Sequence, residues 1–345
     1  MRIGVLTGGG DCPGLNAVIR AIVRRGTVEL GMAFVGFRDA WGGVIDRDVL
    51  PLDIGVVRGI LPRGGTVLGT SRTNPFRIEG GVAAVRATVE DLRLDGLIVI
   101  GGEGTLSVSH ELSVEIGLPV ICVPKTIDND IVGTDRTFGF DTAVHVASEA
   151  LDRLHTTAES HHRAHVVEVM GRNTGWIALH AGLAGGANAI LIPEVPLDAD
   201  EMQRLRDRVN SRFESHFSPI VVVAEGVRPA PGLLNTSPDR HDEHGRLRHG
   251  GIGAAIAADL EQHTGHDVRT TTLGYVQRGG TPTAYDRVLA TRFGLNAVVA
   301  ASEQDWGQMV ALRGSDIVRV PLADVAGRTR SVPRSLYDEA SAFFG

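Results

Sequence analysis

LIVIGGEGT at residues 97–105 and VICVPKTIDND at residues 120–130 are the two stretches that decide the fold. Each begins with four apolar, mostly β-branched residues. The first then changes to a glycine turn and the second to an acid-rich turn. Apolar runs of this length are typical of strands that are buried on both faces. Two such strands predict an open α/β sheet, in which ligands bind beyond the carboxyl ends of the strands.

The same kind of apolar run recurs on both sides of these stretches, with helical segments between the runs. Helical spacing covers residues 17–30, 81–92, 140–154, 200–213 and 252–263. Strands are predicted at residues 3–7, 34–37, 97–100, 120–123, 165–170, 189–192, 220–224, 268–273 and 309–312. This alternation predicts an α/β fold with mostly parallel sheets.

The length of the chain predicts more than one lobe. Its 345 residues exceed one average domain, so we expect two. We expect the larger lobe at 1–139 with a return at about 277–327, and the smaller at 140–276 with about 328–345. Residues 228–250, with three prolines and mixed charge, are predicted to form an exposed loop.

Composition limits the classes of function. Hydrophobic residues make up 43% of the chain and charged residues 22%, which indicates an ordered globular protein. The net charge of -7 offers no general attraction to nucleic acid or to an anionic membrane, so we expect neither as a partner. Two cysteines make no disulfide framework, and no signal peptide or membrane-spanning run is evident. These features predict a cytoplasmic protein.

Two segments outside the deciding stretches suit phosphate binding. TGGGDCPGLN at 7–16 follows one predicted strand and opens a helix, so backbone N–H groups there favour an anion. It is neither a Walker A loop nor a dinucleotide fingerprint, and a purely structural tight turn is the alternative. Arg72, in GTSRTN at 69–74, can fork onto phosphate oxygens, although an ordinary surface arginine could have the same sequence.

Acidic residues are concentrated in the deciding stretches. Glu103, Asp128 and Asp130 can hold Mg²⁺ and accept a proton from an attacking hydroxyl. Because Glu103 lies between glycines, we expect it not to be a charge on a helix face. For Asp128, a helix N-cap is the structural alternative.

Further charged residues follow other predicted strands. Arg172 stands in MGRNTG at 170–175, and Glu225 precedes a glycine. Arg269 and Arg278 add two guanidinium groups near strand ends. The combination suits a substrate that carries phosphate and hydroxyl groups, together with a nucleotide.

Taken together, these strings resemble 6-phosphofructokinase, in its bacterial phosphofructokinase A family. The similarity covers essentially the whole chain, through GGGD (8–11), GGEGT (101–105), PKTIDND (124–130), VEVMGR (167–172), QRGGTP (277–282) and YDR (285–287). The resemblance implies two Rossmann-like three-layer αβα lobes, with the active site in the cleft between them.

The resemblance also implies roles for single residues. ATP would lie against Gly10, Arg72, Gly102, Glu103, Gly104 and Thr105, and Glu103 would hold Mg²⁺ where the family usually has aspartate. Asp128 would be the general base that takes a proton from the C1 hydroxyl of fructose 6-phosphate. Thr126 would touch the transferred phosphoryl group and Arg172 would stabilise its charge. The products would be fructose 1,6-bisphosphate and ADP, as in glycolysis.

The implied sugar site is larger. Its residues would be Thr126, Ile127, Asp128, Arg163, Met170, Gly171, Arg172, Glu225, Arg269, Tyr275, Val276, Gln277 and Arg278. Arg163 and Arg269 would reach the sugar phosphate from a neighbouring subunit, which implies a homodimer or homotetramer. Tyr275 replaces the family's histidine, and its phenol can still donate a hydrogen bond.

Two positions point to different phosphoryl donors, as in the mixed-substrate group of the family. Gly104 is ATP-like, because an aspartate there would put bulk and negative charge in the path of the α-phosphate. Lys125 is typical of the enzymes that use pyrophosphate. We expect ATP to be the donor. An aspartate at position 104 would exclude ATP altogether, and Gly104 leaves that space open, whereas Lys125 only adds attraction to phosphate.

Other functions fit the sequence less well. A pyrophosphate-dependent phosphofructokinase is the main alternative. A non-catalytic sugar-phosphate sensor would keep the arginines but lose Glu103 or Asp128, and both are present. An NAD kinase would not explain Asp128, Arg172 and Arg278, and the glycine spacing disfavours a dinucleotide-dependent dehydrogenase.

Overall fold

The computed structural model describes residues 1–236, 240–241, 247–248 and 250–344. The chain forms two compact units, each built from two segments. Unit 1 consists of Met1–Thr142 and Arg278–Thr329, and unit 2 of Ala143–Gln277 and Arg330–Gly345. Of the loop expected at 228–250, residues 237–239, 242–246 and 249 lie outside the described residues.

Unit 1 is built on a mostly parallel sheet. Its strand order is β14-β13-β5-β4-β1-β2-β3, and β6 pairs with β5. The strands are β1 (Arg2–Gly8), β2 (Ala33–Phe37), β3 (Val49–Leu52), β4 (Gly96–Gly101), β5 (Val120–Thr126), β6 (Phe138–Gly139), β13 (Gln308–Arg313) and β14 (Asp316–Pro321). Only the β2–β3 and β13–β14 pairs are antiparallel among the described pairs of this sheet. Every residue of β4 and β5 is buried, as expected for strands that are covered on both faces.

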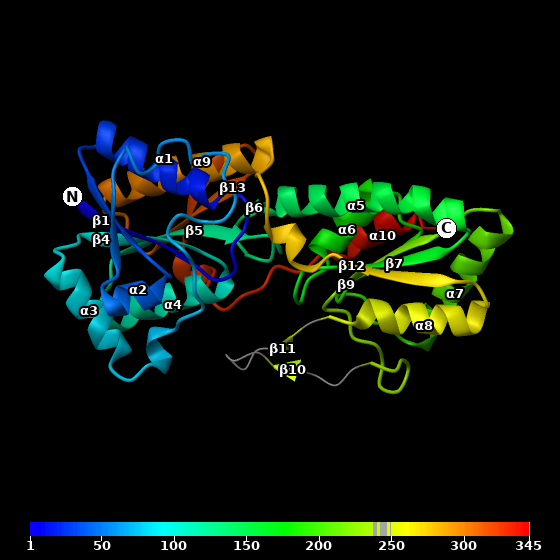
Figure 1. Ribbon diagram of the computed structural model, residues 1–345. Coiled ribbons are helices and arrows are strands. Elements are labelled where there is room, and N and C mark those ends of the chain that lie inside the picture. Colours follow the sequence, from blue (N-terminus) through cyan, green and yellow to red (C-terminus); the bar gives the residue numbers. More distant parts are fainter. Residues whose placement is uncertain (237–239, 242–246, 249, 345) are drawn as a thin grey trace. The chain divides into compact units, whose positions relative to one another are not determined.

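Helices cover both faces of this sheet (Figure 1). On one face lie α1 (Leu15–Val28) and α9 (Ala284–Ser302), which pack against each other. On the other face lie α2 (Trp41–Asp46), α3 (Gly81–Asp91) and α4 (Glu103–Ile116). Two short 3-10 helices, η1 (Pro75–Arg77) and η3 (Leu322–Asp324), complete the described helices of the unit. The result is a three-layer αβα arrangement.

Unit 2 has a smaller sheet that is parallel throughout its described strands. Its order is β12-β7-β9-β8, from β7 (Ala164–Val169), β8 (Ala189–Leu191), β9 (Ile220–Ala224) and β12 (Val268–Thr272). The helices are α5 (Phe140–His161), which begins in unit 1, α6 (Trp176–Ala184), α7 (Ala199–Glu214), α8 (Ile252–Thr264), α10 (Arg334–Ser341) and the 3-10 helix η2 (Gly274–Arg278). Figure 1 shows α5, α6 and α10 on one face and α7 and α8 on the other. A two-stranded pair, β10 (Arg240–His241) and β11 (Leu247–Arg248), interrupts the loop before α8.

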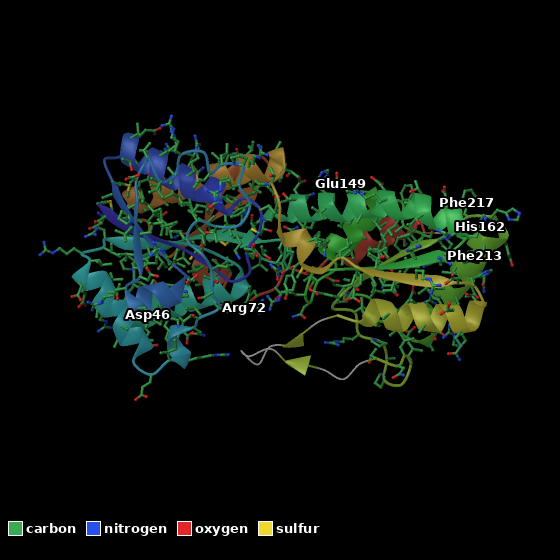
Figure 2. The ribbon with its side chains drawn as sticks, in the orientation of Figure 1. Asp46, Arg72, Glu149, His162, Phe213 and Phe217 are labelled. Carbon is green, nitrogen blue, oxygen red and sulfur yellow. The ribbon has the colours of Figure 1, made fainter. Side chains whose placement is uncertain are left out.

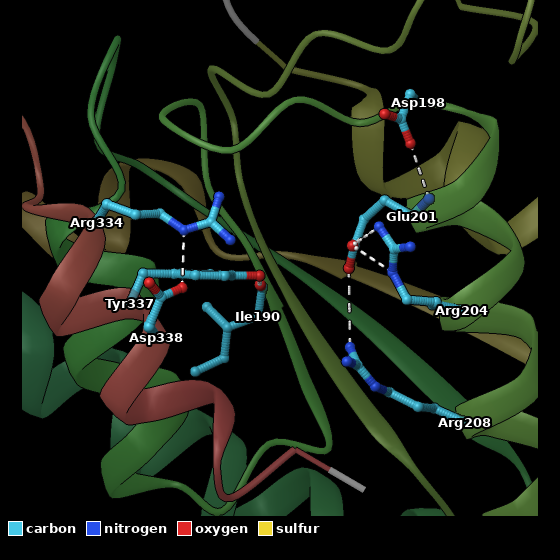
Figure 3. Close-up of polar contacts among 8 residues, drawn as sticks. All are labelled: Ile190, Asp198, Glu201, Arg204, Arg208, Arg334, Tyr337 and Asp338. Carbon is cyan, nitrogen blue, oxygen red and sulfur yellow. Dashed lines mark hydrogen bonds and ion pairs between the residues drawn. The ribbon is translucent and has the colours of Figure 1, made fainter.

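The last helix is fastened to the sheet of unit 2 by a buried tyrosine (Figure 3). The Tyr337 hydroxyl donates a 3.0 Å hydrogen bond to the Ile190 carbonyl of β8. Burial raises the pKa of Tyr337 to about 12, which keeps the hydroxyl protonated as a donor. Asp198 caps α7 nearby by accepting from the Glu201 backbone N–H at 2.9 Å. The second segment of unit 2 is therefore part of its fold, not a loose tail.

The structure confirms the predicted α/β class with mostly parallel sheets. All nine predicted strands and all five predicted helical windows correspond to described elements. The sequence reasoning missed the edge strands β3 and β14 and the helices α2, α4, α6, α9 and α10. Among the helices of the described residues, none is long and apolar enough to cross a lipid bilayer.

Candidate active site

Three turns follow three adjacent strands of unit 1 at the same edge of its sheet. Gly8 of β1 is in register with Gly101 of β4, and Gly101 is in register with Pro124 of β5. The strands therefore end side by side, and the turns after them lie next to one another. This is the edge at which ligands bind in open α/β sheets.

The two glycine turns meet at one threonine. A Cβ on Gly8 would lie 2.8 Å from the Thr105 side chain, and a Cβ on Gly101 would lie 2.4 Å from it. Glycine at both positions therefore lets α4 approach the ends of both strands. Gly9 has a φ of 82°, a left-handed conformation that glycine adopts without strain.

The loop that carries Arg72 is bonded to the first glycine turn. The Gly9 backbone N–H donates to the Ser71 carbonyl at 2.9 Å. The Thr70 hydroxyl donates to the Gly9 carbonyl at 2.6 Å. Arg72, labelled in Figure 2, belongs to this loop and follows Ser71 directly, so it lies beside the Gly8–Gly10 turn.

Two cations border the same turn. The buried Lys125 ammonium donates to the Gly10 carbonyl at 2.5 Å. Arg278 donates from Nη1 to the Asp11 carbonyl at 3.3 Å. Burial lowers the pKa of Lys125, and the neighbouring Arg278 lowers it further, while Cys12, Asp128 and Asp11 act in the opposite direction. Arg278, which the resemblance assigns to the sugar, here contacts the backbone of the glycine turn.

Asp128 follows β5 in a fixed turn. The Thr126 hydroxyl donates to Asp128 Oδ2 at 3.2 Å and accepts from the Asp128 backbone N–H at 3.0 Å. Asn129 holds the turn closed, because its Oδ1 accepts from the Thr137 backbone N–H at 3.1 Å. Asp128 is 3% exposed. It caps no helix, because the next helix, α5, begins at Phe140.

Glu103 differs from our expectation, because it is the first residue of α4. It therefore does lie on a helix, with Gly102 as the N-cap residue. The Ser107 hydroxyl, one turn later, donates to Glu103 Oε1 at 2.9 Å. A carboxylate in the first turn is stabilised by the positive end of the helix dipole. Flanking glycines do not exclude a helix here, because Gly102 is the N-cap residue and Gly104 lies in the first turn of α4.

A magnesium ion would find one carboxylate at this turn. The described residues hold no group of three or more His, Cys, Asp or Glu side chains placed to bind a metal. Mg²⁺ usually keeps several waters and binds through one or two carboxylates together with substrate phosphates. Glu103, in the glycine turn, fits that pattern.

In unit 2, the predicted sugar-binding residues at the carboxyl ends of β7 and β9 lie together. The Glu225 carboxylate accepts from the Arg172 backbone N–H at 3.1 Å. A Cβ on Gly226 would lie 1.8 Å from the Arg172 carbonyl oxygen, so glycine is required for this close approach. Arg172 has a φ of 51° and Gly171 a φ of 147°. The backbone after β7 therefore makes a tight turn with two consecutive positive φ angles, at Gly171 and Arg172.

The remaining predicted residues of unit 2 lie in two other places. Tyr275 and Val276 are exposed in η2, whereas the Gln277 side chain is buried and donates to the Gly274 carbonyl at 3.1 Å. Arg163 and Arg269 lie at the amino ends of β7 and β12. Within one protomer they are thus at the opposite edge of the sheet from Arg172. Ile127, in unit 1, has a fully buried side chain.

The structure singles out two acidic residues to which the sequence analysis assigned no role, although Asp286 stands in the quoted string YDR (285–287). Asp267 forms ion pairs with both Arg163 and Arg269. Its position two residues before Arg269 was the available signal. Asp286, fully buried at the start of α9, accepts from the Thr142 backbone N–H at 2.8 Å and from its hydroxyl at 2.5 Å. An aspartate three residues after a serine, threonine or similar cap is a common helix start, so its burial could not be read from the sequence.

A mostly parallel sheet with two glycine turns, a buried lysine and a buried aspartate at adjacent strand ends defines an α/β protein that handles phosphate groups. The family model described as Phosphofructokinase matches residues 2–301. The chain therefore belongs to the phosphofructokinase family.

Relatives within this family carry two kinds of name. A Streptomyces coelicolor protein named pyrophosphate--fructose 6-phosphate 1-phosphotransferase is 57% identical over 345 residues, covering 100% of both chains. A second protein of that organism, named ATP-dependent 6-phosphofructokinase 3, is 55% identical over 342 residues, covering 99% of both. The structure of phosphofructokinase from Saccharomyces cerevisiae has a TM-score of 0.83 and 34% identity, covering 94% of this chain and 44% of the yeast chain. The present chain thus spans less than half of that yeast chain.

Proposed function

We propose that this chain transfers a phosphoryl group from Mg²⁺-ATP to the C1 hydroxyl of fructose 6-phosphate. The observation that carries the proposal is the buried Asp128, tied to Thr126 after β5 and next to two glycine turns. A carboxylate held at that edge is suited to accept the proton of an attacking hydroxyl. The names of the relatives from Streptomyces coelicolor support a fructose 6-phosphate substrate.

The proposed reaction exchanges one P–O bond for another. The C1 oxygen bonds to the γ-phosphorus as its proton passes to Asp128. The bond from the γ-phosphorus to the β–γ bridging oxygen breaks, and its electron pair leaves with ADP. The protein contributes mainly by positioning the two partners and by neutralising charge. Lys125 and Arg278, which border the Gly10–Asp11 turn, and Arg172 in unit 2 supply that positive charge.

Glu103 would hold the Mg²⁺ ion, which when bound neutralises charge on the donor phosphates. Its interaction with Ser107 fixes the carboxylate in the first turn of α4. Compared with the aspartate usual in the family, glutamate reaches one methylene further.

ATP is the proposed donor because Gly104, the second residue of α4, adds neither bulk nor negative charge beside the glycine turn. Pyrophosphate is the second candidate, and Lys125 favours it. The Lys125 ammonium lies at the Gly10 carbonyl, and a cation there attracts a small, highly charged donor that lacks the contacts of an adenosine group. The pyrophosphate name of the 57% identical relative also favours it.

A neighbouring subunit is proposed to complete the sugar site. β7 holds six residues and spans roughly 20 Å at about 3.3 Å per residue, with Arg163 before its amino end and Arg172 after its carboxyl end. A sugar phosphate held at Arg172 would thus lie at the far end of this strand from Arg163 of the same protomer. We therefore propose that Arg163 and Arg269 serve a second copy of this chain in a homodimer or homotetramer.

The test is formation of fructose 1,6-bisphosphate from fructose 6-phosphate and Mg²⁺, with ATP and pyrophosphate supplied in separate reactions. We expect turnover with ATP. Turnover with pyrophosphate alone would instead assign the donor choice to Lys125. Because Asn keeps the shape of Asp128 but cannot accept the proton, Asp128→Asn should lower kcat by about 10²–10⁴-fold or more. An Asn variant with the wild-type melting temperature and wild-type turnover would contradict the proposed function.

A further inference from the structure

One carboxylate holds the two arginines at the amino end of the unit 2 sheet. Asp267 Oδ2 pairs with Nε of Arg163. Asp267 Oδ1 lies 3.0 Å from Nη2 of Arg269, and Oδ2 accepts from the same nitrogen at 3.2 Å. Among the described residues, no second acidic side chain forms an ion pair with either arginine. Asp267 therefore bridges two guanidinium groups, one from the residue just before β7 and one from β12.

The backbone fixes this group of three side chains. The Ala164 backbone N–H, at the start of β7, donates to the Asp267 carbonyl at 3.1 Å. Arg269 in β12 is in parallel register with His165 in β7. The side chains therefore project from neighbouring, hydrogen-bonded strand ends. Figure 2 labels His162, the residue before Arg163, at this end of unit 2.

The charges leave this group attractive to an anion. Two guanidinium groups and one carboxylate carry a net charge of about +1 at neutral pH. His165 stays neutral beside them, because burial and then the positive charges of Arg163 and Arg269 lower its pKa. The side chains of Arg163 and Arg269 remain 36% and 53% exposed, and that of Asp267 is 32% exposed. A phosphate can thus approach the arginines from solvent.

We propose that Asp267 is a positioning residue, which orients Arg163 and Arg269 for the sugar phosphate bound by a neighbouring copy of this chain. The inference rests on the proposed function, and it adds a residue that does not itself touch the substrate. A flexible arginine side chain loses rotamer entropy when it binds phosphate. Because Asp267 engages the Nε edge of Arg163 and one nitrogen of Arg269, the other N–H groups can face a phosphate. Orientation in advance lowers the cost of binding.

The test is Asp267→Asn in the full chain, with KM for fructose 6-phosphate, KM for the phosphoryl donor and kcat measured at saturating concentrations of the other substrate. Exposed ion pairs make small contributions, so we expect KM for fructose 6-phosphate to rise about two- to tenfold. KM for the donor and kcat should stay at their wild-type values, because the donor turns lie in unit 1. Asp338→Asn is the matched control, since Asp338 is an exposed aspartate that pairs with Arg334 in the same unit.

The outcomes separate the two proposals. Wild-type protein that does not phosphorylate fructose 6-phosphate would overturn the proposed function. Active wild-type protein with an unchanged KM in Asp267→Asn would overturn the inference alone. A lower KM would also overturn it, because Asp267 would then compete with the phosphate rather than prepare its site.

A second comparison distinguishes positioning from a general structural role. In a chain that already carries Arg163→Ala and Arg269→Ala, adding Asp267→Asn should leave KM for fructose 6-phosphate unchanged. The effect of Asp267 is transmitted through those two arginines, so removing them should remove it. A further rise in KM of the same size would show that Asp267 acts by another route.

Discussion

A lysine and an aspartate are buried in unit 1, and burial shifts the pKa of each. Lys125 and Asp286 are both buried in unit 1, one at the glycine turn and one where α9 begins. Burial opposes the charged form of each, so it lowers the pKa of Lys125 and raises that of Asp286 to about 6. Lys125 donates to the Gly10 carbonyl in the first glycine turn, whereas Asp286 connects the first turns of α5 and α9 by accepting from Thr142.

Asp286 gives a pH-dependent prediction. Its pKa is raised from 3.8 to about 6 in the folded chain. The protonated form is therefore favoured by folding, and its contribution is complete below pH 3.8 and lost as the pH rises through about 6. At about 1.4 kcal/mol per pKa unit, the loss is roughly 3 kcal/mol. Asp286→Asn should keep an oxygen that accepts hydrogen bonds from Thr142. Because asparagine does not titrate, the variant should not lose this stability as the pH rises.

Chemical denaturation of both proteins between pH 4 and pH 7 measures this effect. The free energy of unfolding of the Asn variant, relative to wild type, should increase with pH by up to roughly 3 kcal/mol. Taking the difference between the two proteins cancels the titration of other groups. A difference that is flat across this range would show that Asp286 titrates alike in the folded and unfolded chain.

At the scale of elements, the site depends on how closely α4 approaches β1 and β4. Thr105 of α4 occupies the space that side chains on Gly8 and Gly101 would need. The glycines at the ends of these strands therefore set the position of the helix that carries Glu103. A change in how α4 packs against these strand ends would therefore also change the geometry of the two glycine turns.

Gly101→Ala tests this dependence. The new Cβ would lie 2.4 Å from the Cβ of Thr105, so α4 or β4 must shift. Overpacking of this kind costs about 1–3 kcal/mol, and we expect a lower melting temperature together with a raised KM for the phosphoryl donor. Gly279→Ala is the control for stability, because no atom lies within 4 Å of its Cβ position. Equal melting temperatures for the two variants would show that the contact is relieved without cost.

The sequence predicted elements well where their pattern was simple. Strands such as β4 and β5 are continuous apolar runs, so their position follows from composition alone. The helix α6 was not predicted, because it is apolar on nearly all sides and so shows no periodic pattern of apolar and polar residues. In α9, buried residues include Gly294 and Asp286, which interrupt the apolar pattern. The edge strand β14 is only partly buried and has no continuous apolar run.

The candidate site was predictable in outline because strand ends locate turns. Gly10 follows β1 and Asp128 follows β5, with β4 between these two parallel strands, and one bonded loop brings Arg72 to the turn that holds Gly10. The contact of Lys125 with the Gly10 carbonyl joins residues 115 apart, so no local pattern could show it.

At the scale of the whole molecule, β7 has functional residues before and after it. Arg172 follows its carboxyl end, and Arg163 precedes its amino end. Under the proposed arrangement, each protomer lends Arg163 and Arg269 to its neighbour and uses its own Asp128. A complete site therefore requires two chains.

Mixed oligomers test this sharing. Chains with Asp128→Asn and chains with Arg269→Ala should each be impaired, the first in kcat and the second in KM for fructose 6-phosphate. When the two are co-expressed, a hybrid dimer has one site with Asp128 and Arg269 both intact. Random pairing should then restore about a quarter of wild-type activity. Co-expression of Asp128→Asn with Thr126→Ala, which affect the same side of the site, should restore none, and equal recovery in both mixtures would contradict the shared site.

The two-segment construction of each unit has a consequence for how the protein is made on the ribosome. The sheet of unit 1 is not complete until β13 and β14 have been synthesised, and unit 2 needs the segment that begins at Arg330. Before then, one side of β5, the strand that leads to Asp128, lacks its β13 partner. At about 5–20 residues per second, translation of the intervening chain takes on the order of ten seconds. A nascent chain must protect an apolar strand edge for that time, so chaperone supply and translation speed should influence the yield of this protein more than that of one with contiguous domains.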